Sequence, residues 1–158
     1  MERKLKNPWL AMDGYNCIGC CPDNPIGLHL EFYEDGDDIV SHWHPTRNHQ
    51  SWVNVLHGGV QSLIIDETAG WVVFRKLEVS AVTSKMEVKY IKPVYTTPEA
   101  ITIRARIAKQ MRNVVYVDVE IINPAGDICT TAQVIYFCST KEKTMAEFGF
   151  AGCELADE

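Results

Sequence analysis

The feature that most constrains the fold is one long apolar segment, residues 58–77, that begins with two glycines. Its apolar residues fall on nearly every face of a helix of this length: Val60, Leu63, Ile64, Ala69, Trp71, Val72, Val73 and Phe74. A helix that is apolar on most of its faces is buried, whereas a surface helix carries a single apolar stripe. We therefore expect the rest of the chain to be built around this helix.

The patterning on either side of the predicted helix indicates strands. Apolar and polar residues alternate, with many β-branched side chains, over 28–34, 38–44, 81–91, 100–109, 114–122 and 128–138. Strands with one polar face are typical of an antiparallel sheet that is packed on one side. Since one helix cannot cover both faces of such a sheet, we predict an α+β fold in which a curved sheet of about six strands wraps round the helix.

The chain length predicts a single domain over residues 1–158. Residues 1–27 are rich in proline and glycine and are expected to form an irregular lead with a short helix at most. Residues 139–158 form a polar tail, apart from Phe148 and Phe150. The basic N-terminus is not followed by an apolar signal segment, and no run is long enough to cross a bilayer, so we predict a cytoplasmic protein that is not in a membrane.

The net charge of the chain argues against nucleic acid as a ligand, whereas the distribution of the charge favours a small anion. The net charge of −6 makes it a poor general binder of nucleic acid, because that affinity depends on neutralising phosphates. Seven basic and only two acidic residues lie between Lys85 and Arg112, however. This local excess favours a small anionic ligand or a phosphate contact.

The start of the predicted helix carries features of a reactive site. Gly58 and Gly59 cost about 1 kcal/mol each relative to alanine in a helix. Glycine allows a ligand to approach the free N–H groups and the positive end of the helix dipole, as in an oxyanion hole. The alternative is that both glycines only relieve crowding at a tight helix entry.

Two carboxylates, Asp66 and Glu67, are the only charges in the apolar part of this segment. On a buried helix, at least one of them should face a cavity or a partner, because an unpaired buried charge is costly. The alternative is that both lie at a solvated edge.

These residues resemble the signature of the hotdog-fold thioesterases, and specifically of the PaaI-like, phenylacetate-degradation-related acyl-CoA thioesterases. The resemblance rests on His57-Gly58-Gly59 with a carboxylate nine residues after the histidine, at Asp66. The segments 17–28 and 82–93 also resemble stretches of that group. The likeness runs from about residue 17 to 138 and implies a hotdog fold and the hydrolysis of a small or medium acyl-CoA.

The resemblance also implies roles for individual residues. Asp66 matches the general base or nucleophile, and the backbone N–H of Gly58 matches the oxyanion donor, with Gly59 beside the substrate. His57 matches the residue that supports this turn. Thr83 falls where relatives place a hydroxyl that helps to orient the attacking water.

Two groups of substrate-binding residues are expected in addition. Many relatives carry an asparagine six residues before the motif histidine, where this chain has Ser51, and we expect Gln50 or Asn54 to replace it. Coenzyme A carries phosphates, and the basic side chains near the expected mouth are candidates to contact them: Lys89, Lys92, Arg104, Arg106, Lys109 and Arg112. Lys89, Lys109 and Arg112 are the preferred three, although a solvated sheet face would explain each of them singly.

The spacing of Gly58 and Asp66 predicts a site shared between two chains. They are eight residues apart, which is about 12 Å along a helix. An oxyanion donor and a base must both come within about 3 Å of one reacting centre. Gly58 of one chain can meet Asp66 of another across a two-fold axis, so we predict a homodimer, or a tetramer formed from two dimers.

Other chemistries are weaker alternatives. Cys17, Cys20 and Cys21, with His42, His44 and His49, suggest zinc, but a structural site needs four ligands and only one C-x-x-C is present. We therefore expect free thiols, no metal and no cofactor apart from the coenzyme A of the substrate. A non-catalytic acyl-CoA sensor on the same fold remains an alternative. A hydratase is less favoured, because His57 and Asp66 are out of phase on one helix.

Overall fold

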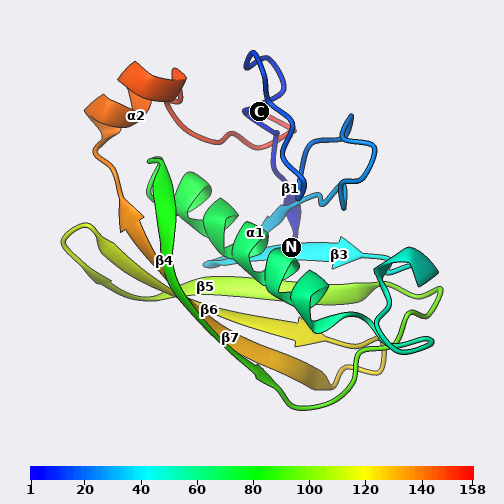
Figure 1. Ribbon diagram of the computed structural model, residues 1–158. Helices are drawn as coiled ribbons and strands as arrows, with labels where there is room; N and C mark the ends of the chain where they lie inside the picture. The colour runs from blue at the N-terminus through cyan, green and yellow to red at the C-terminus, as the bar shows by residue number, and fades with distance from the viewer.

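A computed structural model describes residues 1–158 and shows a seven-stranded antiparallel sheet crossed by one long helix (Figure 1). The elements are β1 (Arg3–Lys4), β2 (Tyr33–Asp35), β3 (Asp38–Trp43), a 3-10 turn (Arg47–His49), α1 (Gly58–Lys76), β4 (Ala81–Tyr90), β5 (Ile101–Met111), β6 (Val114–Ile122), β7 (Ile128–Cys138) and α2 (Lys141–Phe148). The predicted α+β arrangement of a curved sheet round one helix is confirmed, with β1 as an additional short strand.

The order of the strands places the start and the end of α1 near different parts of the sheet. The order is β1-β2-β3-β5-β6-β7-β4, so β4 follows α1 directly in the chain but pairs with β7 at the far edge. Helix α1 is therefore the crossover between β3 and β4, and Figure 1 shows it lying diagonally across the sheet. In the middle of α1, the side chain of Asp66 reaches Thr83 of β4 and Tyr136 of β7, at the site described below.

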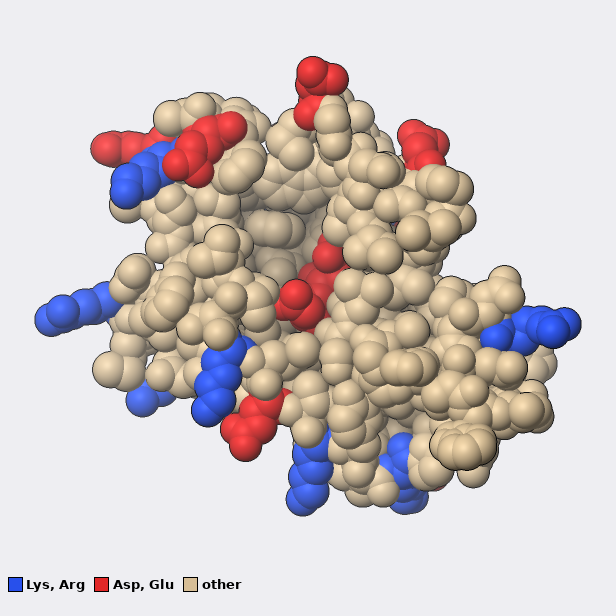
Figure 2. Space-filling view, in the orientation of Figure 1, with Lys and Arg blue, Asp and Glu red and all other residues tan.

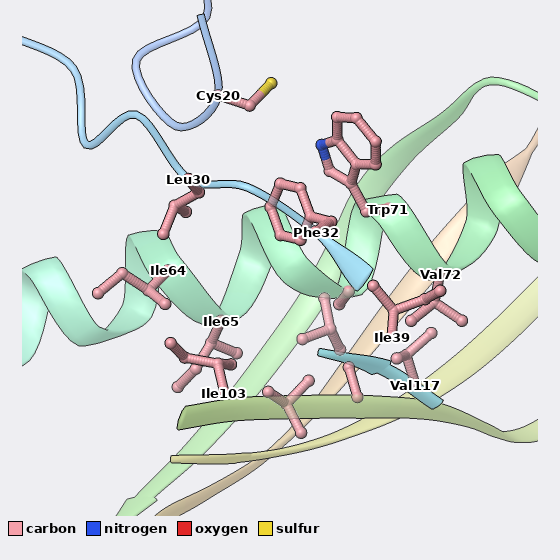
Figure 3. Close-up of a cluster of buried hydrophobic side chains, with 14 of the residues drawn as sticks. Cys20, Leu30, Phe32, Ile39, Ile64, Ile65, Trp71, Val72, Ile103 and Val117 are labelled. Atoms are coloured by element: carbon pink, nitrogen blue, oxygen red, sulfur yellow. The ribbon is translucent and has the colours of Figure 1, made fainter. Parts of the chain in front are cut away.

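One face of α1 forms the core with the inner face of the sheet. Ile64, Ile65, Ala69, Val72 and Val73 are completely buried. They pack toward inward-facing strand residues such as Ile39, Ile103 and Val117 (Figure 3). Each fully buried aliphatic side chain stabilises the fold by about 1.5–3 kcal/mol. This packing fixes the rotation of α1 about its axis, and so determines where the side chains outside the core, such as Asp66 and Glu67, point.

The far end of α1 is fastened to the edge of the sheet by charges. Glu34 of β2 accepts hydrogen bonds from Arg75 Nε at 2.8 Å and Nη2 at 2.9 Å, and from Lys76 Nζ at 2.7 Å. These two cations lower the pKa of Glu34 to about 2, with the bond from Arg75 as the largest cause. The ion pairs are half-buried and join β2 to the last turn of α1.

The prediction of a strand over 28–34 is wrong for most of its length, although its burial pattern is correct. Leu28, Leu30 and Phe32 are buried, but β2 begins only at Tyr33. His29 has a φ of 55°, which interrupts an extended strand. The backbone of this segment bonds instead to the lead, with Leu28 N–H donating to Ile18 O and Leu30 N–H to Gly19 O.

The two ends of the chain are more ordered than the sequence analysis expected. Leu5 pairs with Leu155 in an isolated bridge, and the rings of Trp9 and Phe150 lie 4.7 Å apart. The tail also contains α2, which the sequence analysis did not predict. The side chain of Thr140 accepts a bond from Lys143 N–H at the helix start, and Gly149 ends the helix with a φ of 63°. No helix of the structure has both the length and the apolarity that crossing a bilayer requires.

Candidate active site

A cavity of about 310 Å³ opens beside the middle of α1. Its walls come from the N-terminal lead, α1, the start of β4, β7 and α2: Trp9, Met12, Tyr15, Cys17, Cys20, Asp66, Glu67, Gly70, Phe74, Ser80, Ala81, Thr83, Tyr136 and Phe148. Most of these residues are apolar or aromatic. Figure 2 shows the hollow, with acidic atoms in red at its lower edge. Because Asp66 and Glu67 both line it, the prediction that at least one of them faces a cavity is confirmed.

Asp66 is held in this cavity by two hydroxyl groups that bond to the same oxygen. Thr83 Oγ1 and Tyr136 Oη each donate to Asp66 Oδ1 at 2.8 Å. Tyr136 Oη is also 2.7 Å from the backbone oxygen of Asp66. The second carboxylate oxygen, Oδ2, receives no hydrogen bond from the chain. The arrangement orients the carboxylate and leaves one oxygen available to a substrate or a water.

The sheet register explains why these two hydroxyls meet. Thr83 of β4 is directly opposite Tyr136 of β7, so both side chains lie on the same face of the sheet. The register shifts between Thr83 and Lys85, which marks a bulge next to the site. Such a bulge re-aims a side chain, and here Thr83 is directed toward the middle of α1.

Tyr136 is a residue that the sequence analysis missed. Its side chain is 3% exposed, and burial is the main cause that raises its pKa, so the phenol stays a hydrogen-bond donor at neutral pH. In the sequence it is one of several aromatic residues in a strand pattern. Only the pairing of β4 with β7, which lie far apart in the sequence, places it opposite Thr83.

Glu67 faces the N-terminal lead instead of the hydroxyl pair. Its oxygens lie 3.4 and 3.5 Å from Cys17 Sγ, and Oε1 accepts a bond from Trp71 Nε1 at 3.2 Å. Burial raises the pKa of Glu67 to about 7. The two neighbouring carboxylates of α1 therefore have separate partners, Asp66 in the sheet and Glu67 in the lead.

The first turn of α1 combines a cap with a free backbone donor. His57 Nδ1 accepts the N–H of Gly59 at 2.8 Å, while the N–H of Gly58 has no acceptor within the chain. Tyr90 Oη donates to the backbone oxygen of Gly58 at 2.8 Å. A Cβ atom on Gly59 would lie 3.0 Å from the His57 ring, whereas a Cβ on Gly58 would lie 3.4 Å from the ring of Tyr90. Crowding thus explains Gly59 better than Gly58.

The other expected substrate-binding residues lie outside this cavity in the single chain. Gln50 Oε1 accepts the N–H of Asn54 at 3.1 Å in the loop before α1. Lys89 is exposed on β4, Lys109 Nζ lies 5.6 Å above the Tyr116 ring, and Arg112 is in the β5–β6 turn. The structure brings together Asp66 and Thr83 from the expected set, and leaves the helix start and the basic residues elsewhere.

The histidines that were considered as zinc ligands are not near the cysteines of the lead. His42 contacts Glu2 and Thr102, and His49 contacts Thr46. All six cysteines are free thiols. Cys17 and Cys20 instead lie next to Glu67.

Comparisons with known proteins agree with this fold. Residues 53–130 match the model of the Thioesterase superfamily, and no curated protein sequence matches the chain significantly. A thioesterase superfamily protein designated RHA08564 superposes with a TM-score of 0.71 at 16% identity, over 77% of this chain and 59% of that protein.

Two further solved structures have the same fold. The PaaI protein of the phenylacetic acid degradation operon of E. coli has a TM-score of 0.65 at 17% identity, over 72% of this chain and 81% of that one. A hypothetical thioesterase of Streptococcus pneumoniae, solved with coenzyme A, has a TM-score of 0.64 at 22% identity, over 70% of this chain and 88% of that one. The helix-crossed antiparallel sheet is therefore the hotdog fold of these solved structures, and the central segment 53–130, just under half of the chain, is similar to the thioesterase superfamily.

Proposed function

We propose that this protein is a PaaI-like thioester hydrolase that acts on acyl-CoA. The observation that carries the proposal is Asp66, which lies in a largely apolar cavity with one oxygen fixed by two hydroxyls and the other free. Two structural neighbours support the choice of ligand, because one was solved with coenzyme A and a Streptococcus mutans protein was solved with acetyl-CoA. The apolar and aromatic walls suit a small or medium acyl group.

In the proposed reaction, Asp66 Oδ2 either removes a proton from a water that attacks the thioester carbonyl, or attacks that carbon itself. Thr83 and Tyr136 hold Oδ1, so the carboxylate needs little reorganisation. The tetrahedral intermediate then expels the coenzyme A sulfur as a thiolate, which takes up a proton. In the second route, water must hydrolyse the resulting anhydride. The products are a carboxylic acid and free coenzyme A, and no metal or other cofactor takes part.

The oxyanion of the intermediate requires a donor that a single chain does not place beside Asp66. Gly58 and Asp66 are at separate positions on α1, about 12 Å apart along its axis. We propose that the free N–H of Gly58 from a second copy completes the site. The ten-residue edge strand β4 supports self-association, because an uncovered edge is normally protected. Trp52, at 83% exposure, and Val53, next to the helix start, add apolar surface that such a partner would cover.

The remaining expected residues take their roles in this dimer. His57 and Gly59 shape the helix start, and Gln50 or Asn54 supplies the polar group beside the thioester. Lys89, Lys109 and Arg112 are proposed to meet the coenzyme A phosphates outside the cavity. A tetramer of two dimers and a cytoplasmic location stay predictions.

The test is the turnover of Asp66→Asn on a panel of short, medium and aromatic acyl-CoA esters, measured by thiol release. We expect the wild-type protein to release thiol from at least one ester, and the variant to lose about a hundredfold or more in kcat with an unchanged circular dichroism spectrum. Wild-type binding of acyl-CoA with no thiol release would identify a sensor instead. A hydratase has no support from the geometry, because His57 Nδ1 is occupied by the N–H of Gly59.

A further inference from the structure

Three side chains with metal-binding chemistry meet at one wall of the cavity. The ligand atoms of Cys17, Cys20 and Glu67 all lie within 4.8 Å of one another. The two cysteines form a C-x-x-C in the lead, and Glu67 comes from the middle of α1, about fifty positions later in the chain. The sequence contains one C-x-x-C and no second pair, and nothing in its local pattern connects Glu67 with these cysteines.

The separations match those between ligands of a tetrahedral zinc ion. A zinc ion with a Zn–S bond of about 2.3 Å and a Zn–O bond of about 2.0 Å holds the two ligand atoms about 3.5 Å apart. Cys17 Sγ lies 3.4 Å from Glu67 Oε1 and 3.5 Å from Oε2. Little movement would be needed for these atoms to share one ion.

The surroundings hold the three groups in this geometry. The N–H of Gly19 donates to Cys17 Sγ at 3.3 Å, and Trp71 Nε1 donates to Glu67 Oε1 at 3.2 Å. Outer hydrogen bonds of this kind orient the ligands of metal sites. A Cβ atom on Gly19 would lie 2.5 Å from Glu67 Cδ, so the loop approaches the carboxylate as closely as glycine permits. Figure 3 shows Cys20 and Trp71 on the same side of α1.

The cluster contains acidic groups and lacks a positive partner. Glu67 forms no ion pair with any lysine or arginine of the chain, although thirteen ion-pair contacts are present elsewhere. Glu67 is partly buried, and removing a carboxylate from water without a counter-charge is costly, so a cation between it and the two thiols would reduce that cost. Thiolate ligands select zinc over magnesium or calcium, which prefer oxygen.

We propose that Cys17, Cys20 and Glu67 bind one Zn²⁺ ion, whose fourth position faces the cavity. The two thiols release their protons to solvent on binding, and the ion joins their sulfurs to the carboxylate. The fourth ligand is a water or the hydroxyl of Tyr15, which lies 3.0 Å from Cys20 Sγ. The ion would fasten the lead to α1 one residue after Asp66. This site does not depend on the proposed hydrolysis.

The test adds Co²⁺ or Zn²⁺ alone to the full-length protein after chelation and reduction. Cobalt reports thiolate ligation through its charge-transfer absorption, and calorimetry with zinc gives stoichiometry and affinity. We expect one ion per chain and a higher Tm with zinc. Cys17→Ser, Cys20→Ser and Glu67→Gln should each weaken binding by about a hundredfold or more, which exceeds the effect of losing an outer hydrogen bond.

Cys21→Ser is the matched control, because Cys21 is a buried thiol of the same loop whose sulfur forms its hydrogen bond with the backbone oxygen of Tyr15 and is not among the clustered ligand atoms. It should bind zinc like the wild type. If a cysteine variant fails to fold, Glu67→Gln still decides the matter, since it keeps the shape of the side chain. The proposal is overturned if the reduced protein binds no ion, if Cys21→Ser loses binding as fully as Cys17→Ser, or if Glu67→Gln binds normally. It is also overturned if air oxidation joins Cys17 and Cys20 in a disulfide and the protein, once reduced again, shows no thiolate-to-cobalt absorption when Co²⁺ is added.

Discussion

Two variants that are each inactive should restore one another if the site is shared between two chains. Asp66→Asn removes the proposed base, and Gly58→Pro removes the proposed oxyanion donor, because proline has no N–H. Proline suits this position, since Gly58 is the first residue of α1 and the preceding His57 has an extended backbone with a ψ of 133°. Gly58→Ala is the matched control, because it places the same Cβ near Tyr90 and keeps the N–H.

The expected magnitudes follow from the geometry. Losing one oxyanion donor reduces kcat by about a hundredfold to a thousandfold, and Asp66→Asn should cost about a hundredfold or more. In a mixed dimer, one of the two sites combines both defects and the other combines Gly58 of one chain with Asp66 of its partner. Equal mixing makes half of the dimers mixed, so about a quarter of the wild-type activity should return.

The assay co-expresses the two variants with different affinity tags and measures thiol release from the best acyl-CoA of the panel. The unseparated dimers should show about a quarter of the wild-type activity, and the mixed dimers isolated through both tags should show about half. Each variant alone and Gly58→Ala are run in parallel. A second measure mixes the wild type equally with a chain that carries both Asp66→Asn and Gly58→Pro. If the site is shared, every mixed dimer is inactive and the activity falls to about a quarter of the wild-type value. If each chain had its own complete site, half of the activity would remain. No recovery in mixed dimers of the two single variants, with both folded and associated, would refute the shared site.

Three further predictions follow from individual contacts. Thr83→Val and Tyr136→Phe should each lower kcat about tenfold to a hundredfold. The variant with both substitutions should lose less than the product of the two effects, because both hydroxyls bond to the same oxygen of Asp66. Losses that multiply fully in a double-mutant cycle would contradict this prediction. The pKa of Glu34 is lowered to about 2, so its ion pairs stabilise the fold above about pH 4.5 and lose this contribution as the pH falls toward 2. In Glu34→Gln, the free energy of unfolding should therefore fall less steeply between about pH 4.5 and 2 than in the wild type. The difference is at most about 3 kcal/mol, and solvent screening makes it smaller. If the urea midpoint depends on pH in the same way in both proteins, the ion pairs do not stabilise the fold. Gly19→Ala should destabilise the protein by about 1–3 kcal/mol, because the added Cβ would be overpacked against the carboxylate of Glu67. Gly70→Ala should stabilise α1 by up to about 1 kcal/mol, because its Cβ would meet nothing nearer than 3.8 Å. Urea unfolding measures both changes, and a shift of the two variants in the same direction would contradict this prediction.

Much of the fold could be predicted because its signals are local. The limits of α1 and of the last four strands agree with the sequence patterns within a few residues, since each depends on periodicity and on nearby turn residues. The segment 28–34 shows where periodicity is insufficient. Its alternation correctly indicates which side chains are buried, but the backbone partners come from the lead, and alternation carries no information about partners.

Helix α2 was missed although its local signals are present in the sequence. Thr140 precedes Lys-Glu-Lys, and Gly149 stands just after the last turn, which is a typical cap at each end. The few apolar residues of 139–158 gave no periodic pattern, and this outweighed the caps. The helix matters for the site because Phe148, in its last turn, forms part of the cavity wall.

The site divides in the same way between local and long-range information. Asp66 and Glu67 could be selected from the sequence because a charge on an apolar helix is a local anomaly. Their partners could not, since Tyr136 reaches Asp66 through the β4–β7 pairing, and Cys17 reaches Glu67 through the fold of the lead. Consecutive helix residues point about 100° apart, so the two carboxylates reach opposite walls of one cavity, the sheet and the lead. The lead is therefore part of the site, because it forms one wall of the cavity and contacts the residue next to Asp66, even though none of its residues takes part in the proposed hydrolysis.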